Sequence, residues 1–317
     1  LTERAPPGRV RLGLAMLAAS APGVGAALRR GRPRRGSGRV DAVPVGLPEG
    51  GRVSDPGPDR GTVGILRGCV QQGLFARVGA ATRRTLTANG YQVRAVSDAG
   101  CCGALHAHGG DLDGARRAAR RQIAAFEAAG VDRVAVDAAG CGAAMKAYGL
   151  LLEDDPEWRD RAAGFVRRVR DVTELLAEAG PRPGAPVPLT AVYHAPCHLL
   201  HAQGVDAPVR RVLAAVPGLR VREVAEPGRC CGGAGIHGLT HPEVAGRIAR
   251  EVLDGLVATG ADVVLSGNPG CMMQIGGGLL LDGAGVEVAH PVEVLDESYR
   301  RGGIDGPDTP GTGTGLP

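Results

Sequence analysis

The spacing of eight cysteines constrains this 317-residue chain more than any other feature of its sequence. Written as gaps, the first four read C-x31-CC-x38-C and the last four read C-x32-CC-x39-C, so the pattern recurs at an offset of 128 to 130 residues. The flanks recur too, since Gly-Cys-Cys-Gly spans 100–103 and Arg-Cys-Cys-Gly-Gly spans 229–233. A unit repeated at a fixed offset indicates an internal duplication. The repeated residues are Cys69, Cys101, Cys102 and Cys141 in the first unit, and Cys197, Cys230, Cys231 and Cys271 in the second.

Both units show the same order of expected elements. Short β-branched or apolar runs predict strands at 62–66, 91–96 and 134–136, and again at 190–193, 220–224 and 263–265. Helical spacing predicts helices at 75–89, 113–129, 209–216 and 243–259, with Pro242 at a favoured first helical position. Alternating strands and helices are typical of a parallel sheet. The predicted fold class is therefore α/β, with two tandem pseudo-symmetric βαβ domains that are Rossmann-like and rich in cysteine.

The expected domains are 61–185 and 186–299, preceded by a helical or irregular leader at 1–60 and followed by a disordered tail at 300–317. The leader holds 11 Arg against 5 acidic residues, whereas the rest of the chain holds 26 basic and 28 acidic residues. The predicted domains thus have no basic excess for nucleic acid, and 3% aromatic residues argue against base stacking.

An apolar stretch lies within the leader. Leu12–Leu28 is interpreted as a surface helix in a connector, with a signal peptide as the alternative, and 29–39 as a solvated Arg-rich linker. The chain begins with Leu, which suggests that its true N-terminus is missing. No stretch reaches the roughly 20 apolar residues of a membrane-spanning helix, so no transmembrane segment is predicted.

The cysteines are expected to meet at one edge of each sheet. Ligands of open parallel sheets bind beyond the carboxyl ends of the strands, and each cysteine is expected in a loop just after a strand. Four thiols from three loops would suit a soft metal ion or an iron–sulfur cluster. Zinc usually takes paired C-x-x-C knuckles, which this chain lacks, and adjacent cysteines bridge poorly to each other, which disfavours a disulfide framework. Zinc and disulfides remain alternatives at this point.

Seven of the eight histidines lie near these cysteines in the sequence. Imidazole could be an extra ligand or a proton acceptor, but hydrogen bonding toward thiolate sulfur is the preferred interpretation. No G-x-G-x-x-G follows the first strand, and no paired carboxylates or Ser/His/Asp set stands out, so we predict no catalytic residue, flavin or nicotinamide site. The supporting candidates are His106, His108, His194, His198, His201 and His237.

The duplicated Cys…Cys-Cys-Gly…Cys unit resembles the cysteine-rich CCG domain over about residues 61–298. This domain occurs in the B-type component of heterodisulfide reductase, the lactate-utilisation iron–sulfur protein, the anaerobic glycerol-3-phosphate dehydrogenase small subunit and the glycolate oxidase iron–sulfur subunit. Segments 68–71, 100–106, 140–149 and 193–197 are most similar to the glycolate oxidase subunit, whereas 270–277 is more similar to the lactate-utilisation protein. With this resemblance, iron–sulfur is favoured over zinc.

Two departures from the family pattern matter. The heterodisulfide reductase type ends each unit in C-x-x-C and uses five cysteines for a non-cubane [4Fe–4S] cluster, but Ala144 and Gln274 stand at those positions here. The resemblance therefore implies a four-thiolate [4Fe–4S] cluster, or one with a ligand other than Cys, at one or both sites. The glycolate oxidase subunit normally begins with a ferredoxin-like domain, whose C-x2-C-x2-C-x3-C-P run is absent from this sequence.

The resemblance implies an electron-transfer subunit of a flavin-dependent 2-hydroxyacid dehydrogenase. A separate flavoprotein would oxidise glycolate or lactate, and electrons would pass through this chain toward a quinone-linked acceptor. The expected location is the cytoplasm, either free or peripheral on the inner face of the membrane. The alternatives are a structural zinc module, a scaffold without a cluster, and a disulfide reductase of the heterodisulfide reductase type.

Overall fold

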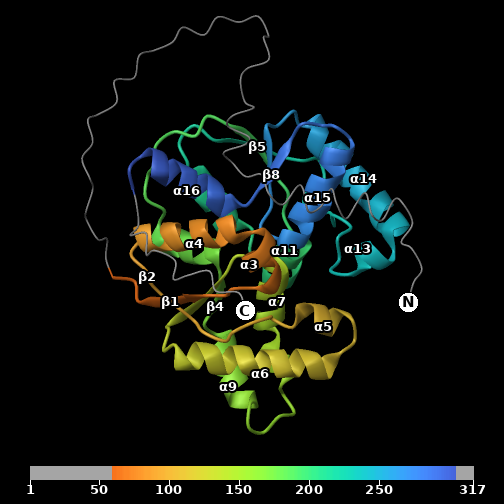
Figure 1. The fold of residues 1–317 in the computed structure, drawn as a ribbon. Helices are drawn as coiled ribbons and strands as arrows, with labels where there is room; N and C mark the ends of the chain where they lie inside the picture. The colour runs from red at the N-terminus through yellow and green to blue at the C-terminus, as the bar shows by residue number, and fades with distance from the viewer. Residues whose placement is uncertain (1–58, 305–317) are drawn as a thin grey trace, which may run out of the picture.

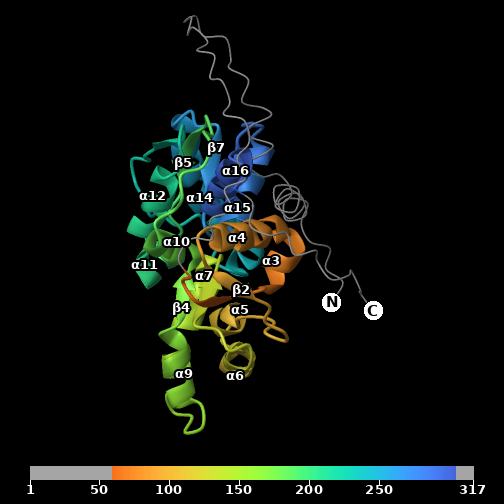
Figure 2. The same cartoon turned by 90° about the vertical axis from the view of Figure 1, so that its left-hand side faces the viewer.

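The computed structural model describes residues 59–304 (Figures 1 and 2). The expectations for Leu12–Leu28, for the linker at 29–39 and for the tail beyond 304 lie outside the described residues. Within 59–304, no helix is both long enough and apolar enough to cross a membrane.

The first half builds a four-stranded parallel sheet in the order β2-β1-β3-β4. Its strands are β1 (Thr62–Ile65), β2 (Gln92–Arg94), β3 (Arg133–Val136) and β4 (Val169–Asp171). Its helices are α3 (Cys69–Leu74), α4 (Ala76–Ala88), α5 (Ala104–His108), α6 (Leu112–Ala128), α7 (Ala139–Lys146), α8 (Tyr148–Leu151), α9 (Arg159–Val166) and α10 (Val172–Ala179).

The second half repeats this sheet in the order β6-β5-β7-β8, again all parallel. Its strands are β5 (Thr190–Tyr193), β6 (Arg220–Arg222), β7 (Val263–Leu265) and β8 (Glu287–Ala289). Its helices are α11 (Cys197–Gln203), α12 (Ala207–Ala214), α13 (His237–Thr240), α14 (Pro242–Ala258), α15 (Pro269–Leu281) and α16 (Pro291–Arg301). The predicted α/β fold with two repeated parallel sheets is confirmed.

Each sheet has a fourth strand that the sequence patterns did not predict. Strands β4 and β8 are three residues long, lie at the edge of their sheets and contain polar residues. Runs that short carry little alternation of apolar and polar residues, which is the main signal for a strand. The last helix, α16, extends to Arg301, two residues into the segment expected to be the tail.

Helices α6 and α14 show why equivalent segments fold alike. In α6, the buried face follows helical spacing through Ala115, Ala119, Ile123 and Phe126. The equivalent face of α14 is also buried, and Pro242 occupies the start of that helix as predicted. Along the sequence, each helix lies between the second and third strands of its half and so forms part of the crossover connection between these two parallel strands.

One hydrophobic cluster contains buried residues of both halves, and a second cluster belongs to the first half alone. Helix α16 of the second half packs on α4 of the first, and α10 of the first packs on α12 of the second. Figure 1 shows α16 lying along α4. The Arg84 guanidinium donates two hydrogen bonds, of 2.7 and 2.6 Å, to the Asp296 carboxylate across this contact. The last helix of each half therefore packs on a helix of the other half, so we expect the two halves to fold together.

Asp171 gives the folded chain an expected dependence on pH. Its buried carboxylate caps α10 by accepting from the Thr173 amide, and burial raises the pKa of Asp171 to about 7. Because the folded state then holds a proton that the unfolded state releases near pH 4, we expect stability to fall as the pH rises from about 4 to about 7. Each unit of difference in pKa is worth about 1.4 kcal/mol.

The matching variant is Asp171→Asn, which keeps an oxygen acceptor for the cap but does not ionise. Urea unfolding of the metal-free protein at pH 5 and pH 8 should show a smaller loss of stability in the variant than in the wild type. An equal loss in both proteins would show that Asp171 is not the residue responsible.

Candidate metal centre

The strand order brings the cysteines to the edge of each sheet at the carboxyl ends of its strands, beside the point where the strand order reverses. In each half the first and third strands are neighbours, so the connections that follow them leave toward opposite faces. Cys69 and Cys141 follow β1 and β3, and Cys101 and Cys102 follow β2. The second half repeats this arrangement with its own four cysteines.

The expectation that every cysteine lies in a loop is wrong for four of the eight. Cys69 and Cys197 are the first residues of α3 and α11, while Cys141 and Cys271 lie in the first turns of α7 and α15. The reason is that helices begin within four residues of these strands, which leaves little room for a loop. The first turn of a helix has free N–H groups that suit a negatively charged sulfur.

The structure brings the four thiols of each half together in a row. In the first half, Cys101 shares hydrogen bonds with Cys69 and Cys102, and Cys102 also contacts Cys141. In the second half, Cys230 is bonded in the same way to Cys197 and Cys231. The Cys231 and Cys271 sulfurs are 3.0 Å apart. The two rows have the same order of residues, so the duplication extends to the contacts between thiols.

Backbone amides face the sulfurs in the same positions of both rows. The Gly103 N–H donates to Cys101 Sγ at 3.4 Å, and the Gly232 N–H donates to Cys230 Sγ at 3.4 Å. Further backbone amides donate to thiols one or two residues earlier in the sequence. They are Val70 to Cys69, Ala104 to Cys102, His198 to Cys197 and Gly233 to Cys231. Such donors stabilise negative charge on sulfur.

The pKa of the first cysteine in each Cys-Cys pair is lowered. Hydrogen bonds from Cys102 and Cys69 hold the pKa of Cys101 far below its usual value, and bonds from Cys197 and Cys231 do the same for Cys230. The pKa values of the donors are raised in turn, for Cys102 chiefly because it donates to Cys101. Each row can therefore carry a thiolate, which is the form that binds a metal.

The donor set fits an iron–sulfur cluster. Cysteine thiolates are the usual ligands of such clusters, and amide hydrogen bonds to sulfur together with solvent exposure set their potentials. Cys102, Cys231 and Cys271 are buried, the last two with 3% of their surface exposed, whereas Cys69 is exposed. Between residues 59 and 304, no three Cys, His, Asp or Glu side chains are arranged to hold a single metal ion.

The six candidate histidines occupy different surroundings. His198 lies beside a thiol, with its Nδ1 3.7 Å from Cys197 Sγ. Its ring is 5.6 Å from the ring of His108, so this pair joins the two halves, and burial together with the charge of His108 lowers the pKa of His198. The others make local contacts, His106 with Asp111, His194 with Ser266, His201 with Gly228 and His237 with the ring of His241. Their role toward the thiols stays a prediction.

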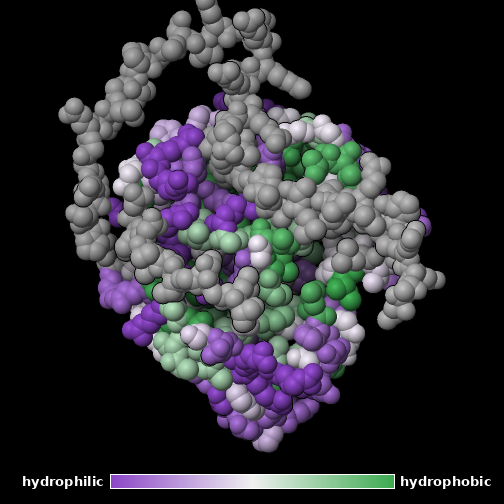
Figure 3. Space-filling view, in the orientation of Figure 1, coloured by the Kyte–Doolittle hydropathy of each residue, from purple (hydrophilic) through white to green (hydrophobic). Residues whose placement is uncertain are grey.

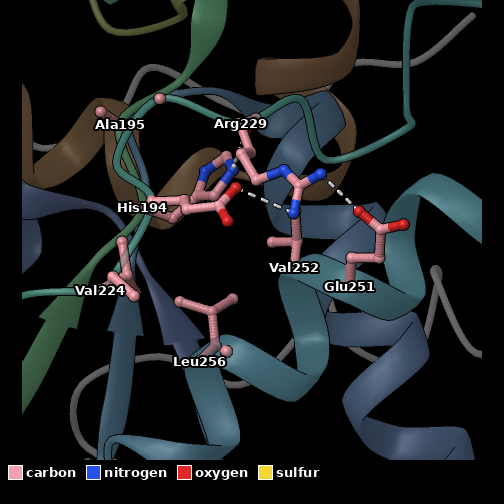
Figure 4. Close-up of a pocket in the computed structure, with 11 residues that line it drawn as sticks. His194, Ala195, Val224, Arg229, Glu251, Val252 and Leu256 are labelled. Atoms are coloured by element: carbon pink, nitrogen blue, oxygen red, sulfur yellow. Dashed lines mark hydrogen bonds and ion pairs between the residues drawn. The ribbon is translucent and has the colours of Figure 1, made fainter.

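A cavity of about 130 Å³ lies behind the second Cys-Cys loop (Figure 4). The Arg229 side chain extends along it to Glu226 at 3.0 Å and Glu251 at 2.5 Å. The buried His194 ring approaches the Arg229 carbonyl with its Nε2 at 3.2 Å, and burial lowers the pKa of His194. These contacts fix the residue that immediately precedes Cys230.

Comparison with known proteins agrees with this duplicated geometry. The profile of one family, described as a cysteine-rich domain, matches residues 63–146 and again residues 191–276. The chain belongs to the CCG cysteine-rich domain family.

Two relatives of the chain are named as iron–sulfur subunits, and a third is named as a lactate utilization protein. The chain is 32% identical over 247 residues to the probable glycolate oxidase iron-sulfur subunit of Bacillus subtilis, covering 76% of this chain and 56% of that protein. It is 30% identical to the glycolate oxidase iron-sulfur subunit of Escherichia coli, covering 75% and 58%. It is also 30% identical to lactate utilization protein A of an Exiguobacterium species, covering 75% and 98%. The chain thus spans little more than half of the two glycolate oxidase subunits.

A solved structure shares the CCG fold. A hypothetical protein from Helicobacter pylori matches 75% of this chain and 48% of its own, with a TM-score of 0.54 and 9% sequence identity. This likeness concerns the fold alone.

The glycine of each CCG motif is required by the backbone. Gly103 and Gly232 have φ of 79° and 81°, a region that L-residues with a side chain rarely adopt. A Cβ at Gly232 would lie 2.4 Å from the Ala245 carbonyl oxygen of α14, and a Cβ at Gly103 would lie 3.0 Å from the Ala118 Cβ of α6. The Cys-Cys loop therefore rests directly on a helix in both halves.

Gly232→Ala should consequently damage the second row. We expect a loss of about 1–3 kcal/mol in unfolding free energy from the backbone strain, and less iron bound after reconstitution. The control is Gly246→Ala in α14, where a Cβ meets no atom within 4 Å and where alanine should stabilise the helix by about 0.5–1 kcal/mol. Urea unfolding and iron content of both variants test this, and equal behaviour would contradict it.

Sequence reasoning missed several residues that support the thiols of this CCG protein. Gln122 on the buried face of α6 donates to the carbonyls of the first Cys-Cys loop, and the Tyr148 hydroxyl donates to the Cys102 carbonyl at 2.7 Å. Gln71 Nε2 donates to the buried Asp137 carboxylate at 2.7 Å and so ties α3 to the end of β3. A polar residue on an otherwise apolar helix face, as at Gln122, is the signal that could have revealed them.

Proposed function

We propose that this chain is an iron–sulfur electron-transfer subunit of a flavin-dependent 2-hydroxyacid dehydrogenase complex, with a four-thiolate [4Fe–4S] cluster in each half. The observation that carries the proposal is the duplicated row of four thiols, in which the same three thiols of each row accept from backbone N–H groups. The names of the relatives support it, since two are iron-sulfur subunits of glycolate oxidase and one is a lactate utilization protein.

When bound, the cluster supplies one-electron transfer, which the side chains of this protein lack. The residues of the chain provide ligation and surroundings. The eight thiolates would hold the irons, the amides of residues such as Gly103 and Gly232 would stabilise the charge on sulfur, and the burial of Cys102 and Cys231 would limit the access of water.

The proposed partner is a flavoprotein that oxidises glycolate or lactate and passes electrons through this chain toward a quinone-linked acceptor.

Figure 3 shows hydrophobic surface in the middle of the molecule and hydrophilic surface around α6 and α9. Leu105 of α5 and Ile236 next to α13 are both more than 40% exposed, and a Cβ at Gly235 would lie 3.1 Å from Leu105. Exposed apolar side chains beside the thiol rows suit contact with a protein partner.

Anaerobic purification with iron, acid-labile sulfide and zinc analysis tests the cofactor. We expect about four iron and four sulfide per occupied site, and an EPR signal on reduction. A colourless protein with stoichiometric zinc and no sulfide would reject the proposal in favour of a structural zinc module.

Reduction of the loaded protein tests the partner. We expect its clusters to be reduced by glycolate or lactate only when the flavoprotein is present. Turnover of a disulfide substrate without the flavoprotein would instead identify a disulfide reductase.

A further inference from the structure

The N-terminus of α7 lacks a cap from its own half. Its N-cap residue is Ala138, whose side chain has no oxygen, although the helix carries Cys141 in its first turn. Helices usually begin with Ser, Thr, Asp or Asn, because a side-chain oxygen there accepts from one of the free N–H groups of the first turn. The amides of α7 therefore need an acceptor from elsewhere.

The second half supplies that acceptor. Asn268 Oδ1 accepts from the Gly140 N–H at 3.1 Å, which is the bond a capping residue would make. The Gly267 carbonyl accepts from the Ala139 N–H at 3.0 Å. In addition, Gln203 Nε2 of α11 donates to the Ala139 carbonyl at 2.8 Å. The helix that carries Cys141 is thus held by three contacts from the other half.

The other end of the Asn268 amide reaches the second row. Its Nδ2 donates to Cys271 Sγ at 3.4 Å, and a donor of this kind stabilises negative charge on sulfur. Asn268 is itself the N-cap residue of α15, yet its side chain makes no bond to the backbone of that helix. Both ends of its amide are used to connect the two rows.

The pseudo-symmetry of the molecule is broken at this position. Ala138 and Asn268 occupy equivalent places, three residues before Cys141 and Cys271, but an alanine cannot make either bond. The link therefore runs in one direction, from the second half to the first, and duplication alone does not account for it.

We propose that Asn268 is a positioning residue that couples the two cysteine rows. Its carbonyl oxygen fixes the first turn of α7 and hence Cys141, while its N–H group stabilises negative charge on Cys271. A substitution of this residue in the second half should therefore alter the cysteine row of the first half. The structural part needs no cluster, whereas the effect on potential rests on the proposed function.

The structural part is tested on the reduced, metal-free protein by amide hydrogen exchange. Asn268→Ala should speed exchange at Gly140 by about fivefold, as expected for loss of one helix cap. Asn268→Asp keeps an oxygen for the Gly140 amide and should leave its exchange close to that of the wild type. Gln203→Ala is the matched control, since it removes a contact with the start of α7 without touching a thiol. Unchanged exchange at Gly140 in Asn268→Ala would overturn the proposal.

The redox part is tested on the loaded protein by potentiometric titration followed by EPR. Proteins with one row each, made by Cys102→Ser or Cys231→Ser, allow each site to be titrated alone. Asn268→Ala and Asn268→Asp should both move the potential of the second site to a more negative value, because both remove the donor to Cys271. The first site should respond to Asn268→Ala and not to Asn268→Asp.

Equal effects of the two variants on the first site would refute the coupling. Gln203→Ala should leave the second site unchanged, and a shift there equal to that of Asn268→Ala would point to a general loosening between the halves. Absence of any cluster would refute the proposed function while leaving the exchange result at Gly140 to stand or fall separately.

Discussion

Cys231→Ser should remove about half of the iron and sulfide from the loaded protein, and Cys102→Ser should remove the other half. Each of these residues is buried and contacts two further thiols of its row. Cys231, for example, contacts Cys230 and Cys271. A serine hydroxyl does not ionise near neutral pH and is a harder ligand than a thiolate. A row with serine at this position should therefore lose its cluster. The double variant should contain no cluster.

The measurement is iron and sulfide per chain together with the EPR signal of the reduced protein. Met272→Leu is the control, because Met272 is buried next to Cys271 and a swap of similar volume costs less than about 1.5 kcal/mol. It should keep the full iron content. Retention of full iron in Cys231→Ser, or loss of all iron from both halves in that single variant, would contradict two separate four-thiol sites.

The duplication could be predicted because the cysteines repeat with nearly constant gaps. A strand followed by a cysteine, as at Ile65 and Cys69, occurs at equivalent places in both units, and a parallel sheet then brings those places to one edge. The short helices that begin at Cys69 and Cys197 could not be predicted in the same way. Six or seven residues do not cover two full turns, so helical periodicity has little room to appear.

Contacts between the two halves could not be predicted from the sequence either. Periodicity shows that α16 has an apolar face, but it does not show that this face covers α4 of the other half. The same limit applies to Asn268, whose partner Gly140 lies 128 residues away. An asparagine before Pro-Gly-Cys predicts a helix cap, and only the relative placement of the two halves turns that cap toward α7.

The shared core leads to the prediction with the largest effect on stability. Tyr299 of α16 has 1% of its surface exposed and lies in the cluster that joins both halves. Its hydroxyl accepts a hydrogen bond from Asn89 Nδ2, at the end of α4, at 3.0 Å. Tyr299→Ala should lower the free energy of unfolding by about 3–5 kcal/mol, because truncation of a buried aromatic residue leaves a cavity.

The matched control is Tyr299→Phe, which keeps the ring and removes only the hydroxyl. It should cost about 1 kcal/mol, most of it from the Asn89 amide that loses this partner. Urea unfolding of the metal-free proteins, followed by circular dichroism and by Trp158 fluorescence, gives both values. Trp158 packs against the core of the first half, whereas Tyr299 belongs to the second half.

Because α16 packs on α4, we expect Tyr299→Ala to shift the fluorescence and circular dichroism transitions together. If Trp158 instead kept its wild-type transition while the circular dichroism signal fell earlier, the halves would unfold independently. The contacts across α4 and α16 would then contribute little to stability, and the link between rows through Asn268 would have to act between two separately folded units.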